Sequence, residues 1–202
     1  MHHSIILRLT LLLPLLLTGI SAVRAQSSAE STWLEAQHTQ VRRLLQTSRP
    51  STRQNAEIQQ ILTGMIDFRE LGKRALGDAW DERDAAEKDE FVRLLGQLMQ
   101  RSYRDGLEST LRYEIRVVGS SSEGGETVVQ TSAQNRENRR EPAIEIAYRI
   151  YRAGDELQVV DVITDGVSML RNYRRQFRRI LRREGWEGLI SRMRERAAES
   201  AN

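Results

Sequence analysis

The chain contains no cysteine, and this absence excludes several classes of protein. A disulfide framework, a thiolate nucleophile and a cysteine-ligated metal site all need that residue. Histidine is nearly as scarce: of the three present, His2 and His3 lie in an N-terminal segment that we expect to be removed. With His38 alone remaining, neither a zinc site of several histidines nor a Cys–His catalytic pair can form. These absences exclude most familiar enzyme chemistry. We expect no metal, no cofactor and no enzymatic activity.

The longest apolar run of the sequence lies near its N-terminus and has the features of a secretory signal peptide. Residues 9–17 are almost entirely apolar and follow a basic residue, Arg8. Small residues at positions −3 and −1 favour cleavage before Gln26. The run is too short for a transmembrane helix, which needs about 20 apolar residues. We expect residues 1–25 to direct export to the periplasm, with an uncleaved anchor as the alternative, and residues 26–202 to form one domain.

The sequence also lacks a large excess of charge of either sign. It has 31 Lys and Arg against 28 Asp and Glu, a formal net charge of +3, which falls to +1 when Arg8 and Arg24 leave with the signal peptide. Aromatic residues make up only 5% of the chain, so few side chains are available to stack on bases. These values argue against a nucleic-acid partner. We expect a monomer.

Apolar periodicity predicts a domain that is helical at both ends and stranded in the middle. Before the strands, Pro50 separates two helices, Asp67 fits the N-cap of a third, and Glu70 three residues later fits a capping box. After the strands, Gly185 breaks a helix that begins at Val167. The predicted helices lie within residues 32–46, 51–65, 66–80, 84–107, 167–184 and 186–196, and residues 197–202 are expected to be a frayed tail.

From Leu111 the periodicity changes to two residues, which is typical of strands with one buried face. We expect four strands: one from Leu111 to a turn at residues 120–125, then residues 126–135, a third with its apolar face in residues 144–150, and residues 157–164. The connections are too short for parallel crossovers, so the sheet should be an antiparallel meander. The expected fold class is α+β, with a four-stranded antiparallel sheet wrapped by about six helices.

Three segments carry a family resemblance. Residues 65–80 hold a short helix ending in Leu-Gly-x-x-Trp, and residues 90–103 are similar to the long helix that follows it in the family. The most specific run is residues 161–177, which contain Asp-Val, Gly-Val-Ser, Asn-Tyr and Gln-Phe in that order. Together, over residues 57–196, they resemble the MlaC family of periplasmic phospholipid carriers, also called toluene-tolerance proteins, and its hopanoid-associated relatives. The pair Thr164-Asp165 departs from the family, which has an apolar or small residue followed by Glu.

The resemblance implies a function as well as a fold. Members of this family are cone-like carriers that hold phospholipid acyl chains in an apolar cavity between sheet and helices. They exchange lipid with an inner-membrane ABC transporter complex and an outer-membrane lipoprotein complex, in a system that maintains outer-membrane lipid asymmetry. The phospholipid would be cargo rather than a cofactor. The candidate cavity residues are Phe68, Leu71, Leu94, Leu98, Tyr103, Ile144, Ile146, Tyr148, Val160, Val162, Val167 and Tyr173.

Two alternatives to a lipid carrier stay open. The apolar sheet face and its covering helices could form a solid core, which would suit an envelope interaction module that binds no lipid. Asp161 and Asp165 are the carboxylates nearest the expected cavity and could serve an isomerase-like enzyme, because an apolar site raises the pKa of a carboxyl group. The simpler interpretation is that Asp161 ends a strand and Asp165 shapes the following turn.

Two further features concern the surface. His38 is expected to lie exposed on a polar face of the first helix. A run of arginines on the helix that begins at Val167 is expected either to be a solvated face or to meet anionic headgroups or acidic partners. The arginines of this patch are Arg171, Arg174, Arg175, Arg178 and Arg179, followed by Arg182 and Arg183.

Overall fold

The computed structural model describes residues 28–45, 51–110 and 112–199, with the backbone alone for residues 102–110. The predicted signal peptide and the side chain of Tyr103 lie outside the described residues. The helices are α1 (Ala29–Leu44), α2 (Thr52–Gly64), α3 (Phe68–Leu76), α4 (Asp78–Asp81), α5 (Ala85–Thr110) and α6 (Met169–Ala198). The strands are β1 (Tyr113–Glu123), β2 (Glu126–Asn135), β3 (Ile144–Ala153), β4 (Glu156–Thr164) and β5 (Val167–Ser168).

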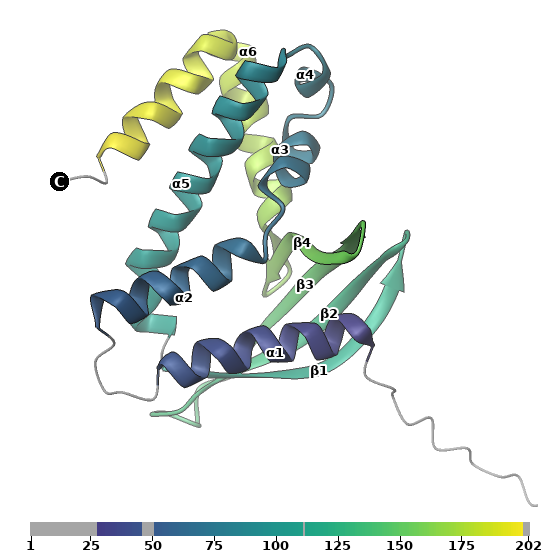
Figure 1. Cartoon of the computed structure of the whole chain (residues 1–202), viewed down its shortest axis with the longest axis vertical. Coiled ribbons are helices and arrows are strands. Elements are labelled where there is room, and N and C mark those ends of the chain that lie inside the picture. Colours follow the sequence, from purple (N-terminus) through teal and green to yellow (C-terminus); the bar gives the residue numbers. More distant parts are fainter. Residues whose placement is uncertain (1–27, 46–50, 111, 200–202) are drawn as a thin grey trace, which may run out of the picture.

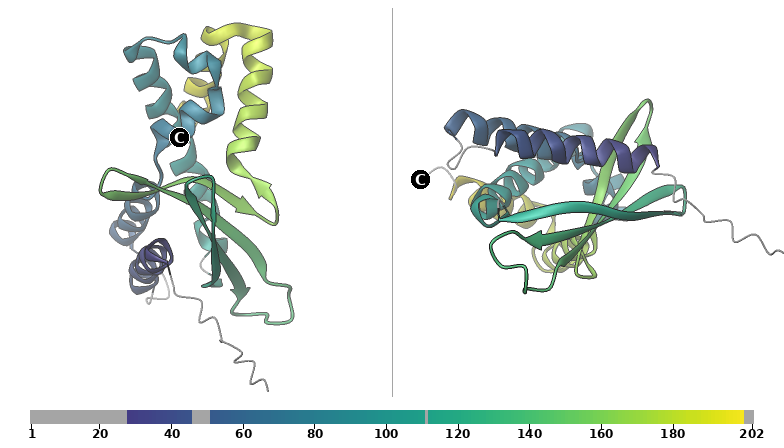
Figure 2. Two further views of the ribbon diagram at one scale, coloured as in Figure 1. Left: turned by 90° about the vertical axis from the view of Figure 1, so that its right-hand side faces the viewer. Right: turned by 90° about the horizontal axis from the view of Figure 1, so that it is seen from below.

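The molecule has a helical end and a sheet end, which Figure 1 shows one above the other. In the helical end, α3, α5 and α6 pack against one another and α4 follows α3. In the sheet end, α1 lies against β1 and β2, and α2 contacts both α1 and α5. The helical end packs on the sheet, where α3 and α6 contact β4, as the left view of Figure 2 shows. The predicted α+β class is confirmed.

The sheet is the predicted antiparallel meander, in the order β1-β2-β3-β4-β5, but it has five strands rather than four. The extra strand arises because Asp165 and Gly166 both have positive φ angles, 46° and 79°, and reverse the chain within two residues. This is the geometry of a tight hairpin. Val167 therefore pairs with Thr164, and α6 begins at Met169 rather than at Val167. The Asp165-Gly166 pair was the feature of the sequence that indicated this tight turn.

The turn between β1 and β2 is also tighter than expected. We predicted a turn over residues 120–125, whereas β1 continues to Glu123 and only Gly124 and Gly125 form the reversal. Both glycines have positive φ angles, 59° and 83°, which a two-residue hairpin requires. The serines before Glu123 are typical of turns, yet they pair with β2 because the glycines alone reverse the chain.

The helix boundaries follow local signals in the sequence. Ser51 caps α2 in a complete capping box with Gln54. The Oδ1 atom of Asp67 accepts a hydrogen bond from the Glu70 backbone N–H at 2.8 Å, as predicted for an N-cap. The second hydrogen bond of the predicted capping box, from the Asp67 backbone N–H to the Glu70 side chain, does not form. The Asp67 N–H donates to the Val159 carbonyl of β4 instead. A helix end that packs on a sheet edge satisfies its backbone groups there.

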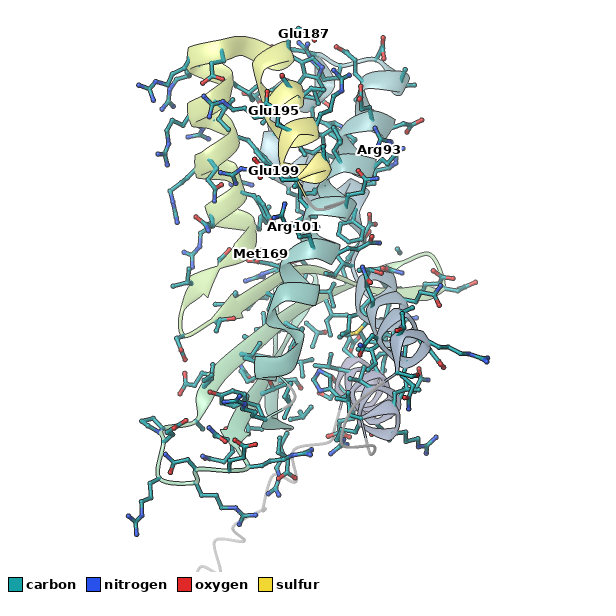
Figure 3. All side chains as sticks on the ribbon, turned by 90° about the vertical axis from the view of Figure 1, so that its left-hand side faces the viewer. Arg93, Arg101, Met169, Glu187, Glu195 and Glu199 are labelled. Atoms are coloured by element: carbon teal, nitrogen blue, oxygen red, sulfur yellow. The ribbon has the colours of Figure 1, made fainter. Side chains whose placement is uncertain are left out.

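The C-terminal helix is longer than expected but has the predicted break. Gly185 has φ 67° and ψ −169°, so α6 consists of two helical halves. The second half runs through Ala198, into the segment that we expected to be frayed. Two contacts explain this order: Ala197 packs against the helical core, and the Arg101 Nη1 atom of α5 donates to the Arg196 carbonyl at 2.8 Å. Figure 3 shows Arg101 beside this half of α6.

Each end of the molecule has its own hydrophobic core. The core of the helical end, called the helical core below, surrounds Phe91, whose ring contacts the rings of Trp80, Phe177 and Trp186. The core of the sheet end, called the sheet core, joins α1 to the strands. Its buried members are Leu34, Met65, Val129, Ile150 and Val159.

Polar contacts tie the two ends together. Arg74 of α3 pairs with Glu70 on its own helix and with Glu126 at the start of β2. Glu126 also accepts a hydrogen bond from Arg149 of β3 at 3.2 Å. Charges in such a network hold one another in place more firmly than an isolated surface pair does. The orientation of α3 on the sheet is therefore fixed by charge as well as by packing.

Across the described ranges, we find no helix that is both long enough and apolar enough to cross a membrane.

Candidate functional site

Neighbouring strands bring apolar side chains together on one face of the sheet. In the strand register, Val129 of β2 lies beside Tyr148 of β3, which lies beside Val162 of β4. Aligned residues of neighbouring strands share a face. This face is turned toward α1, because Val129 belongs to the same core cluster as Leu34. We call it the inner face.

Several side chains of the inner face are only half-buried. Ile144 and Ile146 share the face with Tyr148, since they occupy alternate positions of β3. These three side chains and Val162 keep accessible surface, whereas Val129 is fully buried. Isoleucine and valine are among the residue types most often fully buried, whereas tyrosine is intermediate. The inner face therefore carries incompletely covered apolar surface on its β3 and β4 side.

The inner face holds two titratable rings, and both are neutral near pH 7. His38 of α1 contacts Tyr148 edge to face, with ring centroids 5.6 Å apart. Burial, together with a smaller effect of the nearby charge of Arg42, lowers the pKa of His38 to about 4. Burial raises the pKa of Tyr148 to about 12. A neutral imidazole beside a neutral phenol leaves this surface uncharged, which suits an apolar ligand.

The prediction that His38 is exposed is wrong: only 8% of its surface is accessible. His38 lies one helical turn after Leu34, so both side chains project from the same side of α1 toward the sheet. The i, i+4 pair of Leu34 and His38 was the signal that would have located the correct side.

Five of the twelve predicted cavity residues belong to the helical core instead. Leu71 and Leu94 are buried members of that core. Phe68, Leu98 and Tyr173 are partly buried and pack against it. The structure therefore groups these five with Phe91 and not with Tyr148. Of the predicted cavity residues whose side chains the structure describes, the four residues of β3 and β4 named above share the inner face.

Two more of the predicted cavity residues lie elsewhere. Val160 is completely buried, next to the point where the pairing of β3 with β4 shifts register. Val167 is 60% exposed in β5, because the tight turn at Asp165 and Gly166 places it on the sheet edge and not in a covering helix. The prediction that Val167 lines an inner surface is wrong.

Asp161 forms hydrogen bonds that fix the start of α6. It pairs in register with Arg149, one position away from the Tyr148–Val162 pair, so its side chain projects from the face opposite the inner face. The Ser168 hydroxyl donates to Asp161 Oδ2 at 2.5 Å, and the Leu170 backbone N–H donates to Asp161 Oδ1 at 2.9 Å. Asp161 lies within β4 rather than at its end, and it holds the N-terminus of α6.

Asp165 shapes the turn, as its simpler interpretation predicted. Its Oδ1 atom accepts a hydrogen bond from the Glu145 backbone N–H at 3.0 Å, and its own N–H donates to the Glu145 carbonyl at 2.9 Å. Both carboxylates that could have served an isomerase-like enzyme are thus committed to the corner that joins β4, β5 and α6.

No group of three or more His, Asp or Glu side chains that could hold a metal ion occurs among the residues that the structure describes. The arginines of the predicted patch, Arg171 to Arg183, are all exposed on the first half of α6.

Comparisons with known proteins agree with this architecture. The family model for the MlaC protein matches residues 35–195, which is most of the chain. A relative from Haemophilus influenzae, the intermembrane phospholipid transport system binding protein MlaC, is 22% identical over 137 residues, covering 66% of this chain and 64% of the relative. The chain thus spans slightly less than two thirds of that relative.

A solved structure has the same fold. It is the phospholipid-binding protein from Ralstonia solanacearum in complex with a phospholipid, with a TM-score of 0.71 and 18% sequence identity. The match covers 85% of this chain and 98% of the other. The family match and the shared fold agree with the motifs found in residues 65–80 and 161–177. The chain belongs to the MlaC family.

Proposed function

We propose that this protein is a periplasmic carrier that holds phospholipid acyl chains against the inner face of the sheet. The observation that carries the proposal is the incompletely covered apolar surface of Ile144, Ile146, Tyr148 and Val162. An acyl chain lying on this surface would replace water there. The neutral His38–Tyr148 pair places no charge against it.

Full burial of an acyl chain would supply enough affinity without any polar contact. Burying one CH₂ group stabilises by about 0.8 kcal/mol, so a chain of about 16 carbons gains roughly 12 kcal/mol before the cost of ordering. A carrier needs no catalytic or charged group for this interaction. The headgroup can stay in water, and recognition would then depend on the tails.

The named relatives support this proposal. The Haemophilus influenzae protein is described as a binding protein of an intermembrane phospholipid transport system, and the Ralstonia solanacearum protein was solved with a phospholipid. We further propose export by residues 1–25 and exchange of lipid with an inner-membrane ABC transporter complex and an outer-membrane lipoprotein complex. These steps follow the family resemblance.

Native mass spectrometry of the protein purified from the periplasm without detergent tests the proposal. We expect a bound phospholipid that solvent extraction identifies, or one acquired on incubation with liposomes. A hopanoid would change the class of cargo. A protein that stays free of lipid after liposome incubation would contradict the proposal and favour an interaction module with a solid core.

A matched pair of substitutions locates the site. Ile146→Glu places a carboxylate on the inner face, and we expect lipid retention to be lost. Ala147→Glu makes the same addition on the opposite face of the same strand, because successive residues alternate, and should retain lipid. Equal retention by the two variants would exclude the inner face as the site.

A further inference from the structure

The first half of α6 concentrates the positive charge of the molecule. Residues 169–183 contain seven arginines and no acidic residue. All 28 Asp and Glu residues lie outside this segment, where they outnumber the other 24 Lys and Arg (31 less seven). The small net charge of the whole chain therefore conceals a strong separation of charge. The protein has one cationic helix on an otherwise acidic body.

These arginines occupy the outer side of the helix. Leu170 and Phe177 are buried in the helical core, and Tyr173 and Ile180 pack against it. Every arginine between positions 171 and 183 is exposed. In Figure 3, long side chains with nitrogen tips project from this half of α6 away from α5. We call this surface the arginine face; it consists of Arg171, Arg174, Arg175, Arg178, Arg179, Arg182 and Arg183.

The arginine face lacks the carboxylate partners that arginines have elsewhere. Arg149 pairs with Glu123 and Glu126, and Arg194 pairs with Glu90. By contrast, no member of the arginine face forms an ion pair with any described residue. Guanidinium groups that carry full charge without a protein partner are free to bind anions from solution.

Three members of the face are held by neutral groups. Arg174 donates two hydrogen bonds to the Arg74 carbonyl, at 3.0 and 2.7 Å. Arg171 donates to the Gly166 carbonyl and Arg175 to the Asn172 side chain. The other four have no hydrogen-bond acceptor among the described residues. The arginines nearest the sheet are therefore held in place by neutral acceptors. Those along the rest of the first half of α6 have no acceptor among the described residues.

A hollow adjoins this face. It lies where the two halves of α6 come together, has a volume of about 370 Å³, and is lined by arginines from both halves. Arg179 and Arg183 come from the first half of α6, and Arg192 comes from the second half. Arg192 pairs with Glu184, which ends the first half and also lines the hollow. A cationic hollow of this kind is large enough for the phosphate of a lipid headgroup, which guanidinium groups bind through two parallel hydrogen bonds.

The composition of the face favours a lipid surface over a protein partner. Protein interfaces are usually centred on large apolar or aromatic anchors. Among the described residues, the exposed large hydrophobic side chains are Val118 and Val167, and neither lies on α6. A face of arginines without an apolar anchor matches a dense plane of phosphates, where each basic residue adds to the attraction.

We propose that the arginine face docks the protein on the surface of an anionic phospholipid bilayer. The proposal extends the carrier function, since docking would bring a lipid carrier to its source of lipid, but it rests on a different surface. The acidic remainder of the molecule is repelled by the same bilayer, so the face would also orient the protein as it approaches.

Vesicle flotation with the full-length exported protein tests the proposal. We expect binding to vesicles of phosphatidylcholine mixed with phosphatidylglycerol, no binding to phosphatidylcholine alone, and weakening as salt is raised. The variant R178E/R179E/R182E should bind at least about tenfold more weakly, because each basic residue near the surface contributes to the attraction. The control R136E/R139E/R140E makes the same change of net charge in the exposed loop before β3 and should bind as the unaltered protein does.

The outcomes separate this proposal from the carrier function. An equal loss in both variants would overturn docking through α6, since net charge alone would then explain binding. No binding to the anionic vesicles would overturn it as well and would favour an acidic protein partner. Native mass spectrometry of the same samples gives lipid occupancy separately. Docking without bound lipid would contradict the carrier function alone, and bound lipid without docking would contradict this inference alone.

Discussion

The helical end and the sheet end of this molecule use apolar residues in different ways. In the helical end, Phe91 is completely buried and its ring contacts three other aromatic rings. In the sheet end, Val129 and Ile150 are fully buried, but Ile146 and Tyr148 on the same face are not. Both ends have partly buried apolar side chains around a buried centre, but the helical end is centred on a cluster of aromatic rings, whereas the sheet end has its partly buried side chains in a row on one face of β3 and β4.

This difference separates stability from binding. The ring cluster around Phe91 in the helical core resists deformation, because its side chains already contact one another at interior density. It fixes the position of α3 and α6 on β4. The sheet end can then keep uncovered apolar surface without losing the fold. We expect substitutions in the two ends to differ accordingly.

The largest effect should come from removing the central ring of the helical core. Phe91→Ala should lower the free energy of unfolding by about 3–5 kcal/mol, because it leaves a cavity among rings that cannot collapse. Ile146→Ala on the inner face should cost only about 1 kcal/mol, since that side chain already keeps accessible surface. Urea unfolding of both variants measures the difference. Similar losses would contradict the division into two kinds of core.

The next effect concerns pH and belongs to the sheet end alone. Since the pKa of His38 is lowered from 6.5 to about 4 by burial, the unfolded chain binds a proton between these values that the folded protein does not. Proton binding by the unfolded chain therefore does not lower the free energy of unfolding above about pH 6.5. As the pH drops toward 4, it lowers this free energy by roughly 3 kcal/mol.

His38→Leu should remove this component. We expect the free energy of unfolding of the variant to fall less steeply than that of the unaltered protein between about pH 6.5 and pH 4. Carboxylates that titrate in the same range affect both proteins equally, so the difference in slope isolates the histidine. Equal slopes would show that His38 has the same pKa in the folded and unfolded states, so that burial does not shift it.

A smaller loss is expected at the corner between the two ends. Asp161→Asn should destabilise by about 2 kcal/mol, because the amide keeps one acceptor but loses the charge that holds the Ser168 hydroxyl and the Leu170 N–H. Lipid occupancy should be unchanged, since the side chain projects away from the inner face. Thermal unfolding and native mass spectrometry give the two values. Loss of an isomerase activity with stability unaltered would support the enzymatic alternative instead.

The smallest effects test how closed the helical core is. A methyl group at Gly72 would meet Phe91 Cε1 at 2.9 Å, whereas one at Gly96 would meet Phe68 at 3.8 Å, an ordinary contact. Gly72→Ala should therefore destabilise by about 1–3 kcal/mol through overpacking. Gly96→Ala lies inside α5 and should stabilise by about 0.5–1 kcal/mol. Opposite signs in urea unfolding are expected; two stabilising changes would mean that the core has spare room.

The family motif can now be explained in physical terms. In the run from Asp161 to Phe177, Asp161 and Ser168 hold the start of α6, and Gly166 completes the tight turn before it. Phe177 belongs to the helical core. These residues build the corner that joins the two ends of the molecule, so the motif identifies the fold and does not itself make the inner face.

The sequence by itself determined the order of the elements and most of their ends. Strand periodicity located the meander, and Asp67 and Gly185 marked helix boundaries, because capping and positive φ angles depend on a few neighbouring residues. These signals are local. They required no knowledge of what packs against each element.

Only the tertiary structure decided which apolar residues share a surface. Leu94 and Ile146 each lie on the apolar side of their element, yet one is enclosed by the helical core and the other lies half-buried on the inner face. The burial of His38 and the exposure of Val167 were likewise set by contacts between distant segments. Periodicity shows that a side of a helix or strand is apolar, but burial depends on how completely its partner covers it.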